Sequence, residues 1–238
     1  MTICFSDIVR FTDLSDTLEP ERLATVINSY LSEMTNVALE YGGTIDKFIG
    51  DAVLVFFGDP ETQGEAEDAM RCVEMALKMQ ERVGSLQSYW RKGGIPNELQ
   101  VRMGIATGYC TVGNFGSDQR LKYTALGSPV NLAARLQDMA APNSILADQN
   151  TLSLIGRHVI SEPKGAFTPK GFARDVRYFQ INDLAETALM RQGRELSHIG
   201  KHVEVNVLNS SDIRAAIVEL AEIQERFQHQ ISQSSGET

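Results

Sequence analysis

The most constraining stretch of the chain is residues 44–57, which read TIDKFIGDAVLVFF. β-Branched and aromatic residues dominate Thr44–Phe48, and Ala52–Phe57 is an unbroken apolar run, so both segments are predicted strands. Gly50 permits the positive φ that a tight turn needs, which predicts a hairpin. Asp51 then stands at the tip of the hairpin, directly before a strand that must be buried.

A second aspartate, Asp7, follows another apolar strand, which is predicted over Thr2–Ser6. A carboxylate beside a buried strand is costly unless a cation meets it. Two such aspartates indicate a divalent metal site, because hard cations prefer oxygen ligands. The alternative is that Asp7 caps a helix and Asp51 only shapes the turn.

The 238 residues carry a formal net charge of −9. Non-specific binding to nucleic acid needs a basic surface, so we expect no nucleic-acid partner. Metal ions and local Lys and Arg can still serve a nucleotide substrate. The three cysteines (Cys4, Cys72 and Cys110) are widely spaced, which favours free thiols in a reducing, cytoplasmic compartment. We expect no membrane segment in this chain, because its apolar runs are far too short.

Apolar residues recur at helical spacing over residues 23–41 and 65–89, and strands are predicted over Gln100–Thr107 and Tyr109–Phe115. The order strand, helix, strand, strand, helix, strand predicts an α+β protein with a ferredoxin-like, palm-type sheet and helices on one face. Further C-terminal elements are expected: a polar connection over Gly116–Lys122, a helix over Pro129–Met139, a strand over Ser144–Ala147, a short helix through Leu154 and a last strand over Phe172–Ile181.

The composition changes near residue 182, so we expect one domain over residues 1–182 and a C-terminal extension over residues 183–238. The expected parts of the extension are a polar helix over Asp183–Ser197, a strand over Val203–Leu208, a helix capped by Ser211 or Asp212, and a disordered end over Ser232–Thr238. The last helix has apolar residues at three-four spacing. Packing on its own domain and pairing with a second copy are equally supported.

Five motifs stand in order along the chain: FSDIVRFT from Phe5, KFIGDA from Lys47, VRMGI from Val101, YTALG from Tyr123 and VNLAARL from Val130. Together they resemble the motif series of class III nucleotidyl cyclase catalytic domains, in particular bacterial adenylyl cyclases with Thr in the adenine-binding position. The resemblance covers roughly residues 2–180. It implies the class III cyclase fold, with a catalytic domain over residues 1–182.

Asp7 and Asp51 resemble the two metal-binding aspartates of that family, and the backbone carbonyl ligand corresponds to Ile8. The resemblance implies two Mg²⁺ or Mn²⁺ ions as cofactors. They would clamp a triphosphate and acidify the ribose 3′-hydroxyl for attack on the α-phosphate, with pyrophosphate leaving.

Lys47 and Thr124 resemble the family's purine-reading pair. A lysine ammonium only donates, which suits N1 of adenine, and a threonine hydroxyl can accept from the adenine amino group. Guanine presents the reverse pattern at both atoms. Because a hydroxyl can also donate, we expect the choice of base to be less strict than with the more common Asp.

Asn131 and Arg135 lie four residues apart on one predicted helix and so share a face. They resemble the catalytic pair that orients the ribose and stabilises charge on the α-phosphate. Arg suits the second task because its guanidinium is always charged and forks onto phosphate oxygens. Without the family register, a solvated helix face would be the better interpretation.

The resemblance implies further substrate contacts. Arg102 matches an arginine that reaches the terminal phosphates, and Lys170 matches a late phosphate-binding lysine, with Lys164 as a local competitor. Phe11 and Thr12, which follow the first aspartate motif, are also expected at the substrate.

Arg10 departs from the family pattern, which usually has Gly in the turn after the first metal aspartate. If that turn needs a positive φ, Arg is strained there. Arg10 could also add a phosphate contact.

The predicted function is an adenylyl cyclase that converts ATP to cyclic AMP and pyrophosphate. In the family each site is shared between two catalytic domains, so a chain with both residue sets implies a homodimer, in which Gly113–Lys122 resembles the arm that reaches across. The alternatives are a guanylyl or mixed-specificity cyclase and a catalytically silent, nucleotide-sensing dimerisation module. Since a core strand is predicted from residue 2, we expect an upstream regulatory domain, absent from this chain, that could attach the full-length protein to a membrane.

Overall fold

A computed structural model describes residues 1–95, 98–188, 197–199, 201–206 and 213–234. Its contacts divide the chain into two units, Met1–Leu184 and Ala185–Thr238. The first unit contains these elements: β1 (Thr2–Ile8), α1 (Phe11–Thr17), α2 (Pro20–Glu40), β2 (Thr44–Ile49), β3 (Ala52–Phe57), α3 (Glu65–Lys92), β4 (Val101–Thr107), β5 (Thr111–Ser117), β6 (Arg120–Leu126), α4 (Ser128–Met139), β7 (Ile145–Asp148), α5 (Gln149–Ile155), β8 (Val159–Phe167) and β9 (Val176–Leu184).

The main sheet of the first unit has seven strands in the order β2-β3-β1-β4-β7-β9-β8. Its first four strands are antiparallel neighbours and have the ferredoxin-like order that the sequence predicts. β7 joins parallel to β4, and the antiparallel strands β9 and β8 complete the sheet. The α+β fold class is therefore confirmed.

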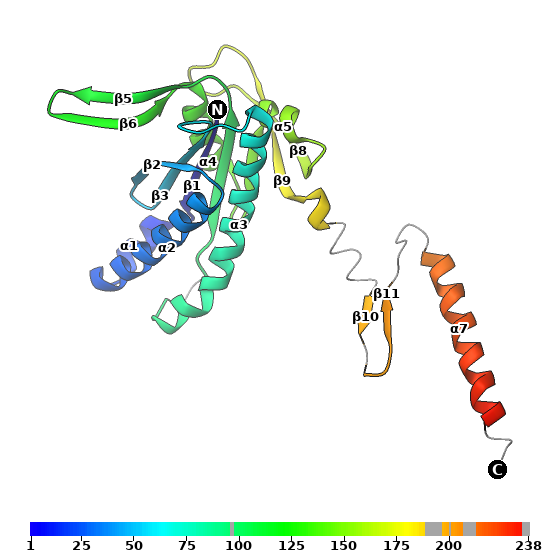
Figure 1. Cartoon of the computed structure of the whole chain (residues 1–238). Helices are drawn as coiled ribbons and strands as arrows, with labels where there is room; N and C mark the ends of the chain where they lie inside the picture. The colour runs from blue at the N-terminus through cyan, green and yellow to red at the C-terminus, as the bar shows by residue number, and fades with distance from the viewer. Residues whose placement is uncertain (96–97, 189–196, 200, 207–212, 235–238) are drawn as a thin grey trace. The chain divides into compact units, whose positions relative to one another are not determined.

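The central strands are buried on both faces, because helices cover each side of the sheet (Figure 1). In β3, Val53 and Val55 pack in the cluster that includes α2 and α3, whereas Leu54 and Phe56 pack in the cluster that includes α4. This explains why Ala52–Phe57 is apolar throughout rather than alternating. The expectation of helices on one face holds for α2 and α3, but α4 covers the other.

Gly104 in β4 allows α4 to approach the sheet closely. A Cβ at this position would lie 2.1 Å from the backbone oxygen of Ala133 and 2.3 Å from the backbone nitrogen of Gln137. Any larger residue would push the helix away. The glycine therefore fixes how α4, which carries Asn131 and Arg135, lies on the sheet.

The segment expected as a polar connection, Gly116–Lys122, instead belongs to a hairpin. β5 and β6 pair from Thr111↔Leu126 to Ser117↔Arg120 and form a separate two-stranded sheet. We call this hairpin, Thr111–Leu126, the β5–β6 arm; it projects from the main sheet (Figure 1). The prediction was wrong because the pairing is local and leaves most of its side chains exposed, so no apolar alternation marks the outer half.

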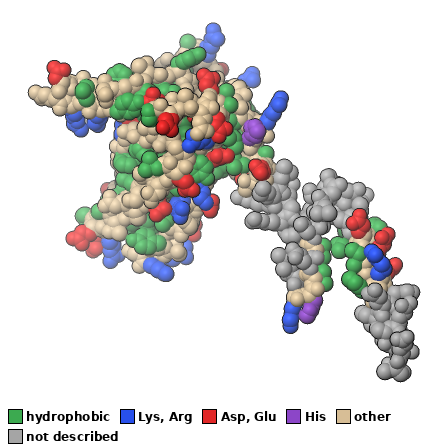
Figure 2. All heavy atoms as spheres, viewed as in Figure 1, with side chains coloured by type: hydrophobic (Ala, Val, Ile, Leu, Met, Phe, Trp, Pro, Cys, Tyr) green, Lys and Arg blue, Asp and Glu red, His purple; other side chains and the backbone are tan. Residues whose placement is uncertain are grey.

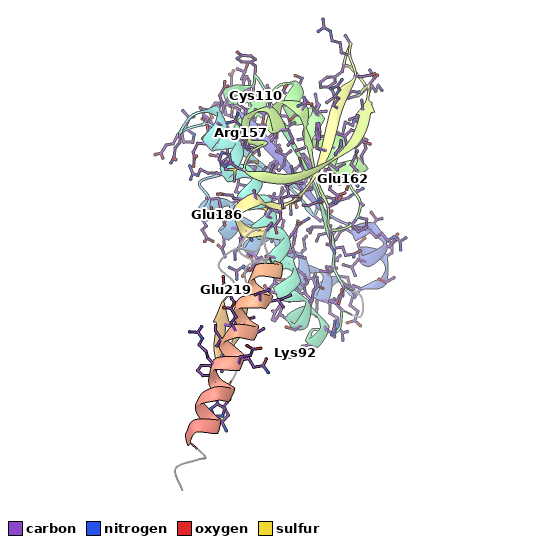
Figure 3. All side chains as sticks on the ribbon, turned by 90° about the vertical axis from the view of Figure 1, so that its right-hand side faces the viewer. Lys92, Cys110, Arg157, Glu162, Glu186 and Glu219 are labelled. Carbon is purple, nitrogen blue, oxygen red and sulfur yellow. The ribbon has the colours of Figure 1, made fainter. Side chains whose placement is uncertain are left out.

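β8 was not predicted, and β9 begins at Val176 rather than at the predicted Phe172. β8 is the edge strand of the sheet and reads VISEPKGAF. An edge strand tolerates the Pro and the charges that argue against a strand in sequence. One of these charges, Glu162, is labelled in Figure 3.

In the second unit, residues 185–188 are helical, β10 (Ser197–Ile199) pairs with β11 (Glu204–Asn206), and α7 spans Ile213–Ser234. The predicted polar helix was wrong at both ends, because Asp183 lies in β9 and Ser197 lies in β10. Its part over residues 189–196 lies outside the described residues, as do Ser211 and Asp212. The end predicted as disordered is helical through Ser234, and residues 235–238 are not described. Within the described ranges, no helix is long and apolar enough to cross a membrane.

Candidate active site

The first part of the site is an acidic pair, Asp7 and Asp51. Asp7 lies near the end of β1, and Asp51 follows Gly50, whose φ of 65° makes the tight β2–β3 turn. β1 and β3 pair antiparallel with Ser6 opposite Val53, so the two aspartates meet at one end of the sheet. The backbone N–H of Ile8 donates to Asp51 Oδ2 at 3.0 Å.

The electrostatics of this pair are unfavourable without a cation. Desolvation and, after it, the neighbouring carboxyl of Asp7 raise the pKa of Asp51 from its ordinary 3.8 to about 7. Two carboxylates so close together cannot both be ionised cheaply. The pair therefore favours either a proton or a positive charge.

One positive charge comes from Arg102. Its Nη2 donates to Asp7 Oδ2 at 2.9 Å, and its Nη1 donates to the backbone oxygen of Asp138 at 3.0 Å. Arg102 stands directly opposite Asp7 in the β1–β4 register, which explains the contact. The amide of Gln137 on α4 donates to the same Asp7 oxygen at 3.1 Å. The expected phosphate-binding arginine thus lies against the acidic pair.

The acidic pair has the donor chemistry of a magnesium or manganese site. The carboxyl of Asp7 raises the pKa of Asp51, so a cation between them would be favourable, and the backbone of Ile8 lies beside Asp51. Among the described residues, no group of three or more Asp, Glu, His or Cys side chains is placed so that it could hold a metal ion. Mg²⁺ commonly takes only one or two carboxylates, with substrate phosphates and water as its other ligands, so the residues present fit such an ion.

A buried hydrogen bond between Ser6 and Tyr30 lies next to the acidic pair. Ser6 Oγ and Tyr30 Oη lie 3.0 Å apart and are fully buried, and they tie β1 to α2. Burial, with the charges of Asp51 and Asp7 nearby, raises the pKa of Tyr30 far above its ordinary value. Tyr30 therefore remains a neutral hydrogen-bonding partner beneath the site.

The second part of the site is a cluster of Asp46, Lys47 and Thr124, which we call the base-reading cluster after the role expected for Lys47 and Thr124. Lys47 on β2 donates from Nζ to Thr124 Oγ1 on β6 at 2.9 Å, so the two predicted residues are in contact. Asp46 was not predicted. Its Oδ2 accepts from Thr124 Oγ1 at 2.6 Å and from the backbone N–H of Ala125 at 3.0 Å.

The third part is the exposed face of α4, which carries Asn131 and Arg135. Arg135 Nη1 lies 3.7 Å from Asp138 Oδ2, one turn further along the helix. Because a turn takes 3.6 residues, side chains two residues apart leave an α-helix in directions about 160° apart. Gln137 is buried and bonded to Asp7, whereas Arg135 lies on the exposed face of the helix. The other carboxylate oxygen of Asp138 lies 4.0 Å from Arg102 Nη2, so Asp138 stands between Arg135 and the contact of Arg102 with Asp7.

The remaining predicted residues lie around these three parts. Lys170 is exposed in the turn before β9, whereas Lys164 lies on β8 with its Nζ 3.0 Å from Glu162 Oε2. Phe11 packs partly against the core, and Thr12 is exposed; both are in the first turn of α1.

Arg10 adopts the left-handed conformation, with φ 56° and ψ 36°, immediately before α1. The turn after Asp7 therefore does require a positive φ, as a glycine at this position would suggest. A non-glycine residue there is strained by about 1 kcal/mol. The exposed Arg10 side chain lies three residues from Asp7 in sequence.

Two residues of the site escaped the sequence analysis, Asp46 and Gln137. Gln137 carried a signal, because it is a polar residue on the apolar stripe of α4 and is 4% exposed. A buried polar side chain must find a partner, and Gln137 finds Asp7. Asp46 carried no such signal, since it looks like one more charge in a strand.

Comparison with known proteins agrees with this geometry. The sequence pattern of the adenylate and guanylate cyclase catalytic domain matches residues 1–182. The chain therefore belongs to the family of class III nucleotidyl cyclase catalytic domains.

Among curated relatives, "Adenylate cyclase 1" of Rhizobium meliloti (strain 1021) is 33% identical over 184 residues, which are 76% of this chain and 27% of that protein. "Adenylate cyclase" of Anabaena cylindrica is 34% identical over 139 residues, 58% of this chain and 27% of that protein. The chain thus spans little more than a quarter of the length of these relatives.

Solved structures cover the domain more completely. The adenylyl cyclase CyaB from P. aeruginosa is 50% identical, with a TM-score of 0.75 over 76% of this chain and 93% of that chain. The guanylyl cyclase Cya2 is 35% identical, with a TM-score of 0.72 over 78% of this chain and 92% of that chain. Because similar structures include both enzyme types, the choice of base has to be argued from the residues of this chain.

Proposed function

We propose that the chain is an adenylyl cyclase that converts ATP to 3′,5′-cyclic AMP and pyrophosphate. The observation that carries the choice of ATP is the contact between Lys47 and Thr124. An ammonium group that only donates complements N1 of adenine, which accepts, and clashes with the N1–H of guanine. The relatives named adenylate cyclase and the 50% identical adenylyl cyclase structure support the same choice.

Asp7, Asp51 and the backbone carbonyl of Ile8 would hold two Mg²⁺ or Mn²⁺ ions. When bound, the ions supply positive charge to the triphosphate and lower the pKa of the ribose 3′-hydroxyl. Once Asp7 binds the ions, Arg102 can turn from Asp7 to the terminal phosphates. Its forked guanidinium suits phosphate oxygens. Lys170 provides a further phosphate contact, and Phe11 and Thr12 line the start of α1.

On α4, Asn131 orients the ribose and Arg135 stabilises the charge that develops on the α-phosphate. Among the described contacts Arg135 meets Asp138 and neither Asp7 nor Asp51, and the motif resemblance implies sites shared between two catalytic domains. We therefore propose a homodimer with two equivalent sites, in which one copy supplies the acidic pair and the other supplies the base-reading cluster and the α4 face.

Exposed apolar residues near these elements support the homodimer. Tyr109, immediately before the β5–β6 arm, is 96% exposed, and Leu121 and Leu126 on the arm are also exposed. Ile49 is exposed at the tip of the β2–β3 hairpin. Cys110, at the base of the arm, is labelled in Figure 3, and Figure 2 shows charged side chains of both signs toward the free end of the arm. A projecting arm with apolar residues and a charged end suits a partner surface.

The test is production of cyclic nucleotide from ATP and from GTP, each with Mg²⁺ and with Mn²⁺. The native chain should form cyclic AMP, and Asp51→Asn should abolish it because the substitution removes a metal-binding carboxylate. Glu67→Gln, which changes an exposed carboxylate in the first turn of α3, is the control and should retain activity. Cyclic GMP as the main product would overturn the choice of base, and no product from a demonstrated dimer would favour a silent, nucleotide-sensing module.

A further inference from the structure

A β-bulge in β2 lets two consecutive side chains, Asp46 and Lys47, contact the same residue, Thr124. In the β2–β3 register, Ile45 pairs with Val55 and Lys47 pairs with Leu54, so Asp46 is the extra residue between them. Consecutive side chains of a regular strand point to opposite faces, and a bulge changes their direction. Both Asp46 and Lys47 can therefore reach Thr124.

The hydrogen bonds of Thr124 are determined by these two neighbours. The side chain of Asp46 is 1% exposed, and a carboxylate can only accept, so Thr124 must donate its single hydroxyl proton to Asp46 Oδ2. Lys47 Nζ donates to one of the two acceptor positions of the same oxygen. What remains on Thr124 is one acceptor position and no donor.

We propose that Asp46 is the positioning residue that sets base specificity, because it makes the Thr124 hydroxyl an acceptor only. An acceptor complements the 6-amino group of adenine and opposes the O6 oxygen of guanine. The inference rests on the proposed function and goes beyond it. It replaces the expectation that a threonine, which can donate or accept, gives a loose choice of base.

The burial of Asp46 makes this restraint strong. Asp46 also accepts from the backbone N–H of Ala125, so its Oδ2 cannot move away without leaving a buried donor unsatisfied. Its other oxygen lies 3.0 Å from Lys47 Nζ and holds the ammonium beside the hydroxyl. If the Thr124 oxygen faces the O6 oxygen of guanine, two acceptors oppose each other, and kcat/KM for GTP should be about tenfold or more below that for ATP.

The competing explanation is that Asp46 only ties β2 to β6. Such a structural role would lower activity with ATP and GTP alike, whereas the proposed role changes their ratio. The measured quantity is therefore the ratio of kcat/KM for ATP to kcat/KM for GTP, with the folded and dimeric state of each variant checked.

Asp46→Ala frees the Thr124 proton and should lower this ratio by about tenfold or more. Asp46→Leu, which keeps a branched side chain but has methyl groups in place of the oxygens, is measured in the same way if the alanine variant does not fold. Asp46→Asn should retain a ratio near the native one, because the N–H of Ala125 keeps the amide oxygen, not its nitrogen, beside Thr124.

Asp68→Ala is the matched control. Asp68 is also buried and also accepts from one threonine hydroxyl and one backbone N–H, but its partners are Thr62 and Gln63 before α3. It should change stability and leave the ratio unaltered. A second control is Thr124→Ala, in which Asp46→Ala should produce no further change if Asp46 acts through Thr124.

An Asp46→Ala or Asp46→Leu chain that is folded and dimeric but keeps the native ratio would overturn the inference. The inference would also be overturned if Asp46→Ala changed the ATP-to-GTP ratio equally in the native chain and in the Thr124→Ala chain. Failure of the proposed function gives a different result, since the native chain itself would then form no cyclic AMP.

Discussion

Replacing Asp51 with asparagine should remove a pH-dependent loss of stability from the metal-free chain. Burial and the carboxyl of Asp7 raise the pKa of folded Asp51 from 3.8 to about 7. Between these values the folded chain holds a proton that the unfolded chain has released. The stabilisation is therefore present at low pH and is lost as the pH rises through the folded pKa.

The magnitude follows from this shift. From pH 5.5 to pH 8.5, the free energy of unfolding should fall by about 2 kcal/mol at full strength, since each pH unit of retained protonation contributes about 1.4 kcal/mol. The side chain is only half-buried, and water screens part of the interaction, so we expect about 1 kcal/mol. Asn has no titrating group, so Asp51→Asn should gain this amount relative to the native chain across the same range.

The assay is urea unfolding of both chains at the two pH values with a metal chelator, and Asp118→Asn serves as the exposed control. Added Mg²⁺ should then stabilise the native chain at the higher pH, because a ligand that binds only the folded state raises its stability, and it should stabilise Asp51→Asn much less. A stability difference between native and variant that stays constant from pH 5.5 to pH 8.5 would refute the assignment of Asp51 to a strained acidic pair.

Three further predictions concern α4, the turn after β1, and the dimer. Gly104→Ala should destabilise the chain by about 3 kcal/mol in urea unfolding, because the new Cβ would lie 2.1 Å from the backbone of α4. The control Gly84→Ala, in open space on α3, should stabilise the chain by about 1 kcal/mol. Similar effects of the two substitutions would contradict the close approach of α4. Arg10→Gly should stabilise the chain by about 0.5 kcal/mol, because glycine adopts a positive φ without strain. The control Arg22→Gly, at an exposed position in α2, should lower the free energy of unfolding by about 1 kcal/mol. A loss of stability at both positions would count against strain at Arg10. Cyclase activity per chain should fall on dilution below the dimer dissociation constant, and activity independent of concentration across that range would argue for a complete site in one chain.

The elements that could be predicted from sequence are those whose signal is local. The hairpin over residues 44–57 combines two β-rich segments with a glycine turn, and α2 and α3 have long apolar faces, so each was found with nearly its observed bounds. β8 was missed because an edge strand accepts Pro163 and charged residues. The β5–β6 arm was partly missed because a projecting hairpin buries too little to impose a pattern.

The contacts of the site depended on pairing between distant strands. Arg102 meets Asp7 because β1 and β4 place them opposite each other across 95 residues of sequence. Asp46 reaches Thr124 because of a bulge, which has no signature in TIDKFI. The sequence identified which residue types were present, but the bulge and the register determine which of them act together.

The measurement that tests the central claim most directly is complementation between two inactive chains. Asp51→Ala lacks part of the acidic pair, and Arg135→Ala lacks the arginine of α4. If each site takes its acidic pair from one copy and its arginine from the other, a mixed dimer has one site with both defects and one site with neither. An equal mixture should therefore regain roughly one quarter of native cyclic AMP production, since about half of the dimers are mixed and each has one working site. A mixture of Asn131→Ala and Arg135→Ala should regain no activity. Both residues lie on α4, so each site of a mixed dimer keeps one of the two defects. No recovery from the Asp51→Ala and Arg135→Ala mixture, in dimers shown to exchange chains, would contradict a site formed between two copies.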